Sequence, residues 1–145
     1  MSKILIATDL SKSSNDVFSV GFDLARRLNS GIVLVTIINE LVEYVPMDIG
    51  ISFADQWEAR LYIAQRELNR IKSEHADLDI EIITFVGDPK KDVIEQSIKS
   101  EASYIVLGTH GRTGLSHMVM GSTAEYVIRH STVPVVVVPY NRNLH

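Results

Sequence analysis

The chain has 145 residues, a formal net charge of −4 and no cysteine, and 46% of its residues are hydrophobic. The length fits one domain, 1–145, with a core of its own. A chain without cysteine has no disulfide, no thiolate metal site and no thiol catalysis, which fits a cytoplasmic protein. The mild acidity predicts no general nucleic-acid surface, and the longest apolar runs are too short to cross a bilayer. We therefore expect neither nucleic acid nor a membrane as a partner.

Five short apolar runs predict strands, and the first of them leads into an aspartate, Asp9. That first run is too short for the hydrophobic region of a signal peptide, so we interpret it as a strand. The second run is apolar throughout, as expected for a strand covered on both faces. The predicted strands are 3–8, 32–39, 80–86, 104–107 and 133–138.

Between these strands, apolar residues recur at helical spacing. The first helix follows candidate N-caps in residues 11–15 and stops at 29–31. The third follows Gly87-Asp88-Pro89, which indicates a turn, an N-cap and an N1 proline. The expected inward residues are Val17, Val20, Leu24 and Leu28 in the first helix, Phe53, Trp57, Leu61, Ala64, Leu68 and Ile71 in the second, Val93, Ile94 and Ile98 in the third, and Ala124, Val127 and Ile128 in the fourth.

Strands that alternate with helices along a whole chain predict the α/β class, with a single doubly wound parallel sheet and helices on both faces. Ligands of such sheets bind at the carboxyl ends of the strands, where the winding reverses. Residues 40–52 break the alternation because Pro46 and Gly50 interrupt any periodicity. A loop folded over the sheet is one interpretation of them, and a lid or interface flap is the other.

A glycine-bearing stretch after the fourth strand is the most informative part of the chain. Gly108 and Gly111 are followed, after nine intervening residues, by Gly121 and Ser122, which open the fourth helix. Glycine lets a backbone approach a ligand closely, and the first N–H groups of a helix, together with its dipole, favour anions. Ser122 and Thr123 add hydroxyls that can reach phosphate oxygens. The alternative is that the glycines only turn the chain and that Ser122 or Thr123 only caps the helix.

Several familiar motifs are absent from the sequence. There is no G-x-x-x-x-G-K-[ST] and no G-x-G-x-x-G, which removes the P-loop and the dinucleotide fingerprint. The five histidines show no H-E-x-x-H spacing, and there is no G-x-S-x-G elbow. No catalytic set can be named, so the sequence favours a binding protein over a dedicated enzyme.

The glycine spacing, together with the opening strand that ends in Asp9 and the closing run 133–139, resembles the ATP-binding subgroup of the universal stress protein family. The resemblance covers nearly the whole chain. It implies strand order 3-2-1-4-5, an adenine-nucleotide α-hydrolase-like fold, and binding of ATP, or of AMP or ADP, with at most slow hydrolysis. Mg²⁺ or Mn²⁺ would accompany the phosphates. The family commonly forms a homodimer through the last strand, 133–138, whose apolar edge invites pairing; an edge that Pro139 simply caps is the alternative.

The resemblance also implies a set of site residues. Asp9 is expected beside the nucleotide, where it contacts a ribose hydroxyl or, indirectly, the metal ion; the alternative is a cap for the Ser11 region. Ile37 would pack on the adenine, or is a plain core residue. Arg112 would bind phosphate, or is a solvated loop residue. The family often has proline where this chain has Ala7. The expected nucleotide-binding residues are Ala7, Asp9, Thr36, Ile37, Leu107, Gly108, Gly111, Arg112, Gly121, Ser122 and Thr123.

Three functions remain open from sequence. The first is an ATP-binding regulator or sensor of the stress response. The second is a dimeric interaction module of the same fold that binds no nucleotide. The third is an enzyme that slowly hydrolyses ATP, which the absence of an evident general base disfavours.

Overall fold

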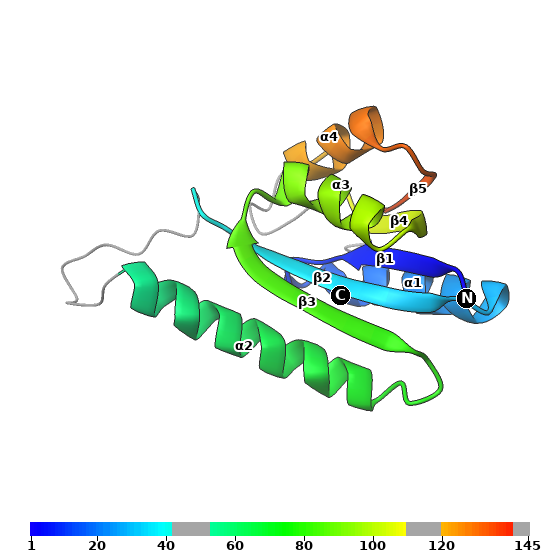
Figure 1. The fold of residues 1–145 in the computed structure, drawn as a ribbon, viewed down its shortest axis with the longest axis horizontal. Coiled ribbons are helices and arrows are strands. Elements are labelled where there is room, and N and C mark those ends of the chain that lie inside the picture. Colours follow the sequence, from blue (N-terminus) through cyan, green and yellow to red (C-terminus); the bar gives the residue numbers. More distant parts are fainter. Residues whose placement is uncertain (42–52, 110–119, 141–145) are drawn as a thin grey trace.

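The computed structural model describes residues 1–41, 53–109 and 120–140, and these form a five-stranded sheet with helices on both faces (Figure 1). Elements alternate along the chain as predicted. In chain order they are β1 Lys3–Ala7, α1 Ser14–Leu28, β2 Gly31–Asn39, α2 Phe53–Ser73, β3 Ile80–Gly87, α3 Pro89–Lys99, β4 Ala102–Gly108, α4 Ser122–His130 and β5 Val135–Val138. Within these ranges, no helix has both the length and the apolar character needed to cross a membrane.

Every strand pair in the sheet is parallel, and the strand order is β3-β2-β1-β4-β5. This confirms the predicted fold class and strand order. The last strand begins at Val135, whereas the sequence placed its start at Val133. The reason is a local turn, because the N–H of Val133 donates to Ser131 Oγ at 3.1 Å instead of joining the ladder.

Two apolar layers hold the helices on the sheet. The first lies between the sheet and α1 and α2, and includes Ile4, Ile6 and Leu34 from the strands. The second lies between the sheet and α3 and α4, and includes Leu5 and Val33. Because successive strand residues point to opposite faces, each central strand feeds both layers, as its uninterrupted apolar sequence predicted.

Helix α1 buries only part of the predicted face: Val17 is buried and Leu24 packs against the core. Val20 is 39% exposed and Leu28 is 44% exposed, so these two assignments were wrong. The helix turns Gly21 toward the sheet instead: a Cβ built there would lie 2.5 Å from Ile6 Cδ1. A glycine lets the helix approach β1 closely, and the stripe around it becomes the core face. The buried residues of α1 are Ser14, Val17, Phe18, Gly21, Phe22 and Ala25.

Two further inward assignments were also wrong, in α3 and in α4. Ile98 is 59% exposed and Ile128 is 44% exposed. Helix α3 centres its buried face on Val93 and Ser97, and α4 centres its own on Ala124 and Val127. In each helix the exposed isoleucine comes one residue after a buried one, which turns it about 100° away from the sheet.

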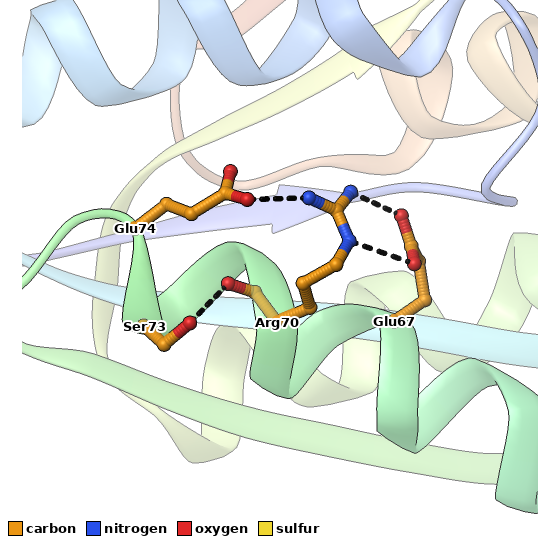
Figure 2. A network of polar contacts seen from close by, with 4 residues as sticks. All are labelled: Glu67, Arg70, Ser73 and Glu74. Carbon is orange, nitrogen blue, oxygen red and sulfur yellow. Dashed lines mark hydrogen bonds and ion pairs between the residues drawn. The ribbon is translucent and has the colours of Figure 1, made fainter.

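Helix α2 carries a polar network on its solvent side (Figure 2). Arg70 Nε donates to Glu67 Oε2 at 3.1 Å, and Arg70 Nη1 donates to Glu74 Oε1 at 2.6 Å. Ser73 Oγ donates to the Arg70 carbonyl at 2.6 Å. The hydrogen bond from Arg70 holds the pKa of Glu67 below its ordinary value of 4.5. Pairs spaced three and four residues apart support a helix modestly.

The burial of α1 predicts a sharp contrast between two of its residues. Phe22 is 2% exposed and stacks on Phe18 with ring centroids 5.7 Å apart. We expect Phe22→Ala to lower the free energy of unfolding by about 3–5 kcal/mol because it leaves a cavity. The matched variant Leu28→Ala, on the exposed side, should cost less than about 1 kcal/mol. Chemical denaturation measures both, and equal losses would contradict the observed helix orientation.

The network on α2 predicts a small, pH-dependent stabilisation. A folded pKa below the unfolded one means that the contribution of Glu67 is complete above the unfolded value and is lost as the pH falls through the folded value. Glu67→Gln should therefore lower the thermal midpoint slightly at pH 7, where solvent screens the pair. The difference from wild type should shrink as the pH falls below 4.5 and should vanish only once the pH is below the lowered pKa of Glu67 in the folded protein. A difference that persists in acid, or one unchanged when Arg70→Met is also present, would contradict this role.

Candidate functional site

The carboxyl ends of β1 and β4 lie side by side and make the reversal point of the sheet (Figure 1). The chain leaves β1 toward α1 on one face and leaves β4 toward α4 on the other. Asp9 follows the end of β1 and Gly108 ends β4. The fold therefore brings Asp9 and Gly108, which are far apart in sequence, to the carboxyl ends of two neighbouring strands, where doubly wound proteins bind ligands.

Two backbone hydrogen bonds close the base of the β4–α4 connection. The N–H of Thr109 donates to the Val138 carbonyl at 3.0 Å, and the N–H of Gly121 donates to the Thr109 carbonyl at 2.6 Å. The chain thus leaves the sheet at Thr109, and Gly121, at the start of α4, binds back to that residue. These bonds hold the start of α4 next to the end of β4. The predicted phosphate contacts Gly111 and Arg112 lie outside the described residues.

Among the described residues, no side chain caps the start of helix α4. Its N-cap residue is Gly121, with φ −62° and ψ 151°, and the first helical N–H bond runs from Glu125 to the Gly121 carbonyl at 3.1 Å. Neither Ser122 nor Thr123 therefore occupies the N-cap position. Since the first N–H groups of a helix have no partner within it, this end of α4 has the donors and the dipole that favour an anion.

Asp9 sits in a tight turn between β1 and α1. Its Oδ1 accepts a hydrogen bond from the N–H of Ser11 at 2.9 Å, so the capping alternative holds for that oxygen. The N-cap residue of α1 is Ser13, and it makes no side-chain cap bond. Leu10, the next residue, has a positive φ of 60°. Asp9 itself remains partly exposed at the edge of the sheet.

The other predicted site residues on the strands are mostly buried. Ile37 is 8% exposed and Leu107 is 3% exposed, and both belong to the layer under α3 and α4. The side chain of Ile37 therefore takes the position of a core residue. Thr36 points to the opposite face and is 1% exposed, and within the described ranges its Oγ1 has no hydrogen-bond partner. Ala7 ends β1 and is partly exposed.

The backbone of β2 offers a feature that the sequence could not reveal. Thr8 N–H donates to the Val35 carbonyl at 3.0 Å, and β1 ends at Ala7. In a parallel ladder every second residue presents its N–H and C=O to the same neighbour. Ile37 therefore presents its backbone donor and acceptor toward β1's side of the sheet, just beyond the point where β1 stops pairing. No residue-type signal could have found this, because it depends on register alone.

The described residues contain no cluster of three or more His, Cys, Asp or Glu side chains that could hold a metal ion. Asp9 is the carboxylate nearest in sequence to the end of β1. One carboxylate fits a hard cation held mainly by a ligand's phosphates, because Mg²⁺ usually keeps several waters and few protein ligands.

Comparison with known proteins identifies the family. The family model described as the universal stress protein family matches residues 1–139. A universal stress protein from Methanocaldococcus jannaschii is 28% identical over 142 residues, which covers 94% of this chain and 81% of that protein. One from Mycobacterium tuberculosis is 31% identical over 135 residues, which covers 92% of this chain but 44% of that longer protein.

Solved structures share the fold. Universal stress protein UspA from Lactobacillus plantarum has a TM-score of 0.82 at 20% identity, covering 94% of this chain and 97% of that one. A universal stress protein solved in complex with cAMP has a TM-score of 0.70 at 22% identity, covering 97% and 98%. One from Archaeoglobus fulgidus, in complex with dAMP, has a TM-score of 0.59 at 20% identity, covering 95% and 98%. The fold agrees with the sequence comparison, and this chain belongs to the universal stress protein family.

Proposed function

We propose that this protein binds an adenine nucleotide, ATP first among them, at the carboxyl edge between β1 and β4. Binding would make it a nucleotide-dependent regulator or sensor in the stress response. The observation that carries the proposal is the start of α4, where the N-cap residue is a glycine and no side chain in the described part of the chain acts as a cap. The hydrogen bond from Gly121 to Thr109 holds this helix start at the end of β4. AMP or ADP would use the same position with fewer phosphates.

The phosphates would bind at the start of α4. The backbone N–H groups of a helix N-terminus and its dipole attract phosphate without any lysine. The hydroxyls of Ser122 and Thr123 stand in the first turn, and the N-cap residue is Gly121. Gly111 and Arg112, from the connection before α4, would complete the contacts. Gly121 has an ordinary extended backbone conformation, so the value of a glycine here is the close approach that it permits a ligand.

The base would be read by the backbone of β2. A backbone residue carries one N–H donor and one C=O acceptor, and the Watson–Crick edge of adenine offers a matching acceptor at N1 and donor at N6. Guanine presents the opposite pattern at these two positions. The ladder position of Ile37, beyond the last hydrogen bond from the β1 side, therefore supports adenine over guanine. Two structural neighbours were solved with cAMP and with dAMP, which share adenine.

Asp9 would complete the site from the β1 side. Its carboxylate would accept a hydrogen bond from a ribose hydroxyl, or would support Mg²⁺ or Mn²⁺ through a bound water. The divalent ion would neutralise part of the phosphate charge. We propose no dedicated catalysis, since the sequence offers no evident general base, and any hydrolysis would be slow. The protein would act by binding.

A titration of the purified protein tests the nucleotide proposal. Wild type should bind ATP with Mg²⁺ and bind GTP more weakly. Gly121→Ala should weaken ATP binding by at least about tenfold, because its methyl group occupies the space that the phosphates approach. Isothermal titration calorimetry measures each affinity.

Gly31→Ala is the matched control for the titration. Gly31 starts β2, at the amino ends of the strands and so at the end of the sheet away from the proposed site. A Cβ at Gly31 would meet its nearest atom, Asp79 Oδ2, at an ordinary 3.6 Å. This variant should bind ATP like wild type. Absent binding by wild type, or equal binding by wild type and Gly121→Ala, would contradict the proposal.

We also propose a homodimer through β5, which lies at one edge of the sheet. The Pro134 carbonyl accepts the N–H of Ile105 in β4, and the Val138 carbonyl accepts the N–H of Thr109 just after β4, each at 3.0 Å. By the alternation of the ladder, Val135 and Val137 then present their N–H and C=O groups away from β4. An apolar edge of this kind favours pairing with a second copy.

A proline substitution tests the edge pairing. Val137→Pro removes an outward N–H and leaves the acceptors used by β4 in place, so we expect a monomer. Val137→Thr keeps the N–H and the branched shape and should remain a dimer like wild type. Analytical ultracentrifugation measures the mass in solution. A monomeric wild type, or a dimeric Val137→Pro, would rule out this interface.

A further inference from the structure

The turn between β1 and α1 is tied together by one buried hydroxyl. Thr8 is 9% exposed, and its Oγ1 donates to Ser14 Oγ at 2.7 Å. The same oxygen accepts the N–H of Leu10 at 3.0 Å. Thr8 is also fixed through its own N–H, which donates to the Val35 carbonyl. A single side chain therefore connects the strand, the turn and the first residue of the helix.

Leu10 is the residue of this turn whose backbone conformation is strained, with a φ of 60°. Three non-glycine residues in the described ranges have positive φ: Leu10, Asn29 and Glu101. Asn29 is the C-cap of α1, and Glu101 directly follows the C-cap of α3; left-handed residues commonly stop helices at these positions. Leu10 stops no helix. A leucine in this conformation is strained, and such strain persists only where surrounding contacts impose it.

Asp9 lies between these two residues. Its neighbour on one side is Thr8, anchored to β2 and α1, and its neighbour on the other is Leu10, whose N–H is bonded to Thr8. The carboxylate is tied in turn to Ser11 N–H at 2.9 Å. The direction of the Asp9 side chain therefore depends on the part-buried bond from the Leu10 N–H to Thr8 Oγ1.

We propose that Thr8 is a positioning residue that sets the Asp9 carboxylate to accept a hydrogen bond from a ribose hydroxyl of the nucleotide. This inference rests on the proposed nucleotide-binding function and extends it to sugar recognition. Thr8 acts through the backbone of Leu10 and touches no ligand. Its role is to keep the carboxylate oriented before the nucleotide arrives, so that no binding energy is spent on ordering the turn.

The structure supplies variants that separate positioning from packing. Thr8→Val keeps the shape of the buried side chain but removes both hydroxyl bonds. Ser14→Ala removes only the bond to the helix and leaves the bond to Leu10. Thr8→Ser keeps a hydroxyl and should rescue the function. Asp9→Ala removes the carboxylate itself and defines the value expected when the sugar contact is lost.

The readout is the ratio of dissociation constants for deoxyribose and ribose nucleotides, measured with ATP, 2′-deoxyATP and 3′-deoxyATP by calorimetry. Wild type should prefer ATP to at least one deoxy form by about tenfold or more, as expected for a hydrogen bond to a charged group. Thr8→Val and Asp9→Ala should bring the ratio near one. Ser14→Ala and Thr8→Ser should keep it. A merely structural loss would weaken all three nucleotides equally.

The outcomes distinguish this inference from the proposed function. No binding of any adenine nucleotide by wild type would overturn the proposed function and the inference with it. Binding with an unchanged ratio in Thr8→Val would overturn the inference alone, as would an equal loss in Ser14→Ala. If Thr8→Val does not fold, Leu10→Pro replaces it, since proline removes the same N–H and excludes a φ near 60°. A wild-type ratio in that folded variant would also overturn the inference.

Discussion

The parallel pairing of β1 with β4 is the constraint on which the candidate site depends. These two strands are far apart in sequence, yet they lie in register from Ile4 beside Tyr104 to Ile6 beside Val106. Their buried residues are fully enclosed by helices on both faces, so the register is fixed by core packing. Once it is fixed, the turn that holds Asp9 and the start of α4 must meet at one edge. The site is a consequence of the core, and no local sequence could produce it alone.

The two helix N-termini on the α3/α4 face show how differently the chain treats equivalent positions. At α3, Asp88 accepts the N–H of Lys90 at 3.1 Å and the N–H of Asp88 donates to Asp92 Oδ2 at 2.9 Å. Carboxylates there satisfy backbone groups and would repel an anion. At α4 the N-cap residue is a glycine, and no side chain of residues 1–41, 53–109 or 120–140 caps the helix. Carboxylates thus occupy the N-terminus of α3, whereas the N-terminus of α4 suits a phosphate. The difference is an aspartate at the N-cap of α3 and a glycine at the N-cap of α4.

Much of the architecture could be predicted from the sequence, because strands covered on both faces are apolar throughout and glycine or proline marks most boundaries. The helix faces were harder. Val20, Leu28, Ile98 and Ile128 fit a helical stripe but are exposed, since the rotation of a helix is chosen by what it can approach. The rotation of α1 is set by Gly21, which lies against Ile6. A prediction that places large apolar residues inward cannot detect a glycine at the centre of the buried face. For the candidate site, the sequence predicted that Asp9 and Gly121 contact the same ligand.

The parts of the site that the sequence missed are backbone features. The backbone N–H and C=O of Ile37 extend past the end of β1 because the pairing of β1 with β2 ends at Thr8. Thr8 matters because its side-chain oxygen accepts the N–H of Leu10. Neither follows from residue type. Family resemblance supplied positions such as Ile37 and Leu107, but the structure buries both side chains. Any contact that Ile37 makes with a base would therefore come from its main chain, which tolerates many side chains at this position.

Among the described residues, the amino and carboxyl ends of the strands differ in how their polar groups are paired. At the amino edge, Ser2 Oγ lies 2.6 Å from Ser30 Oγ, and Arg26 binds Asp77 at 2.7 Å. At the carboxyl edge, Leu10 is strained and the buried Thr36 hydroxyl has no partner within the described residues. An unpaired buried hydroxyl costs about 1–3 kcal/mol. Natural proteins keep such local violations chiefly where function requires them. Both features support the proposal that the ligand binds at the carboxyl edge, and neither depends on the glycine spacing.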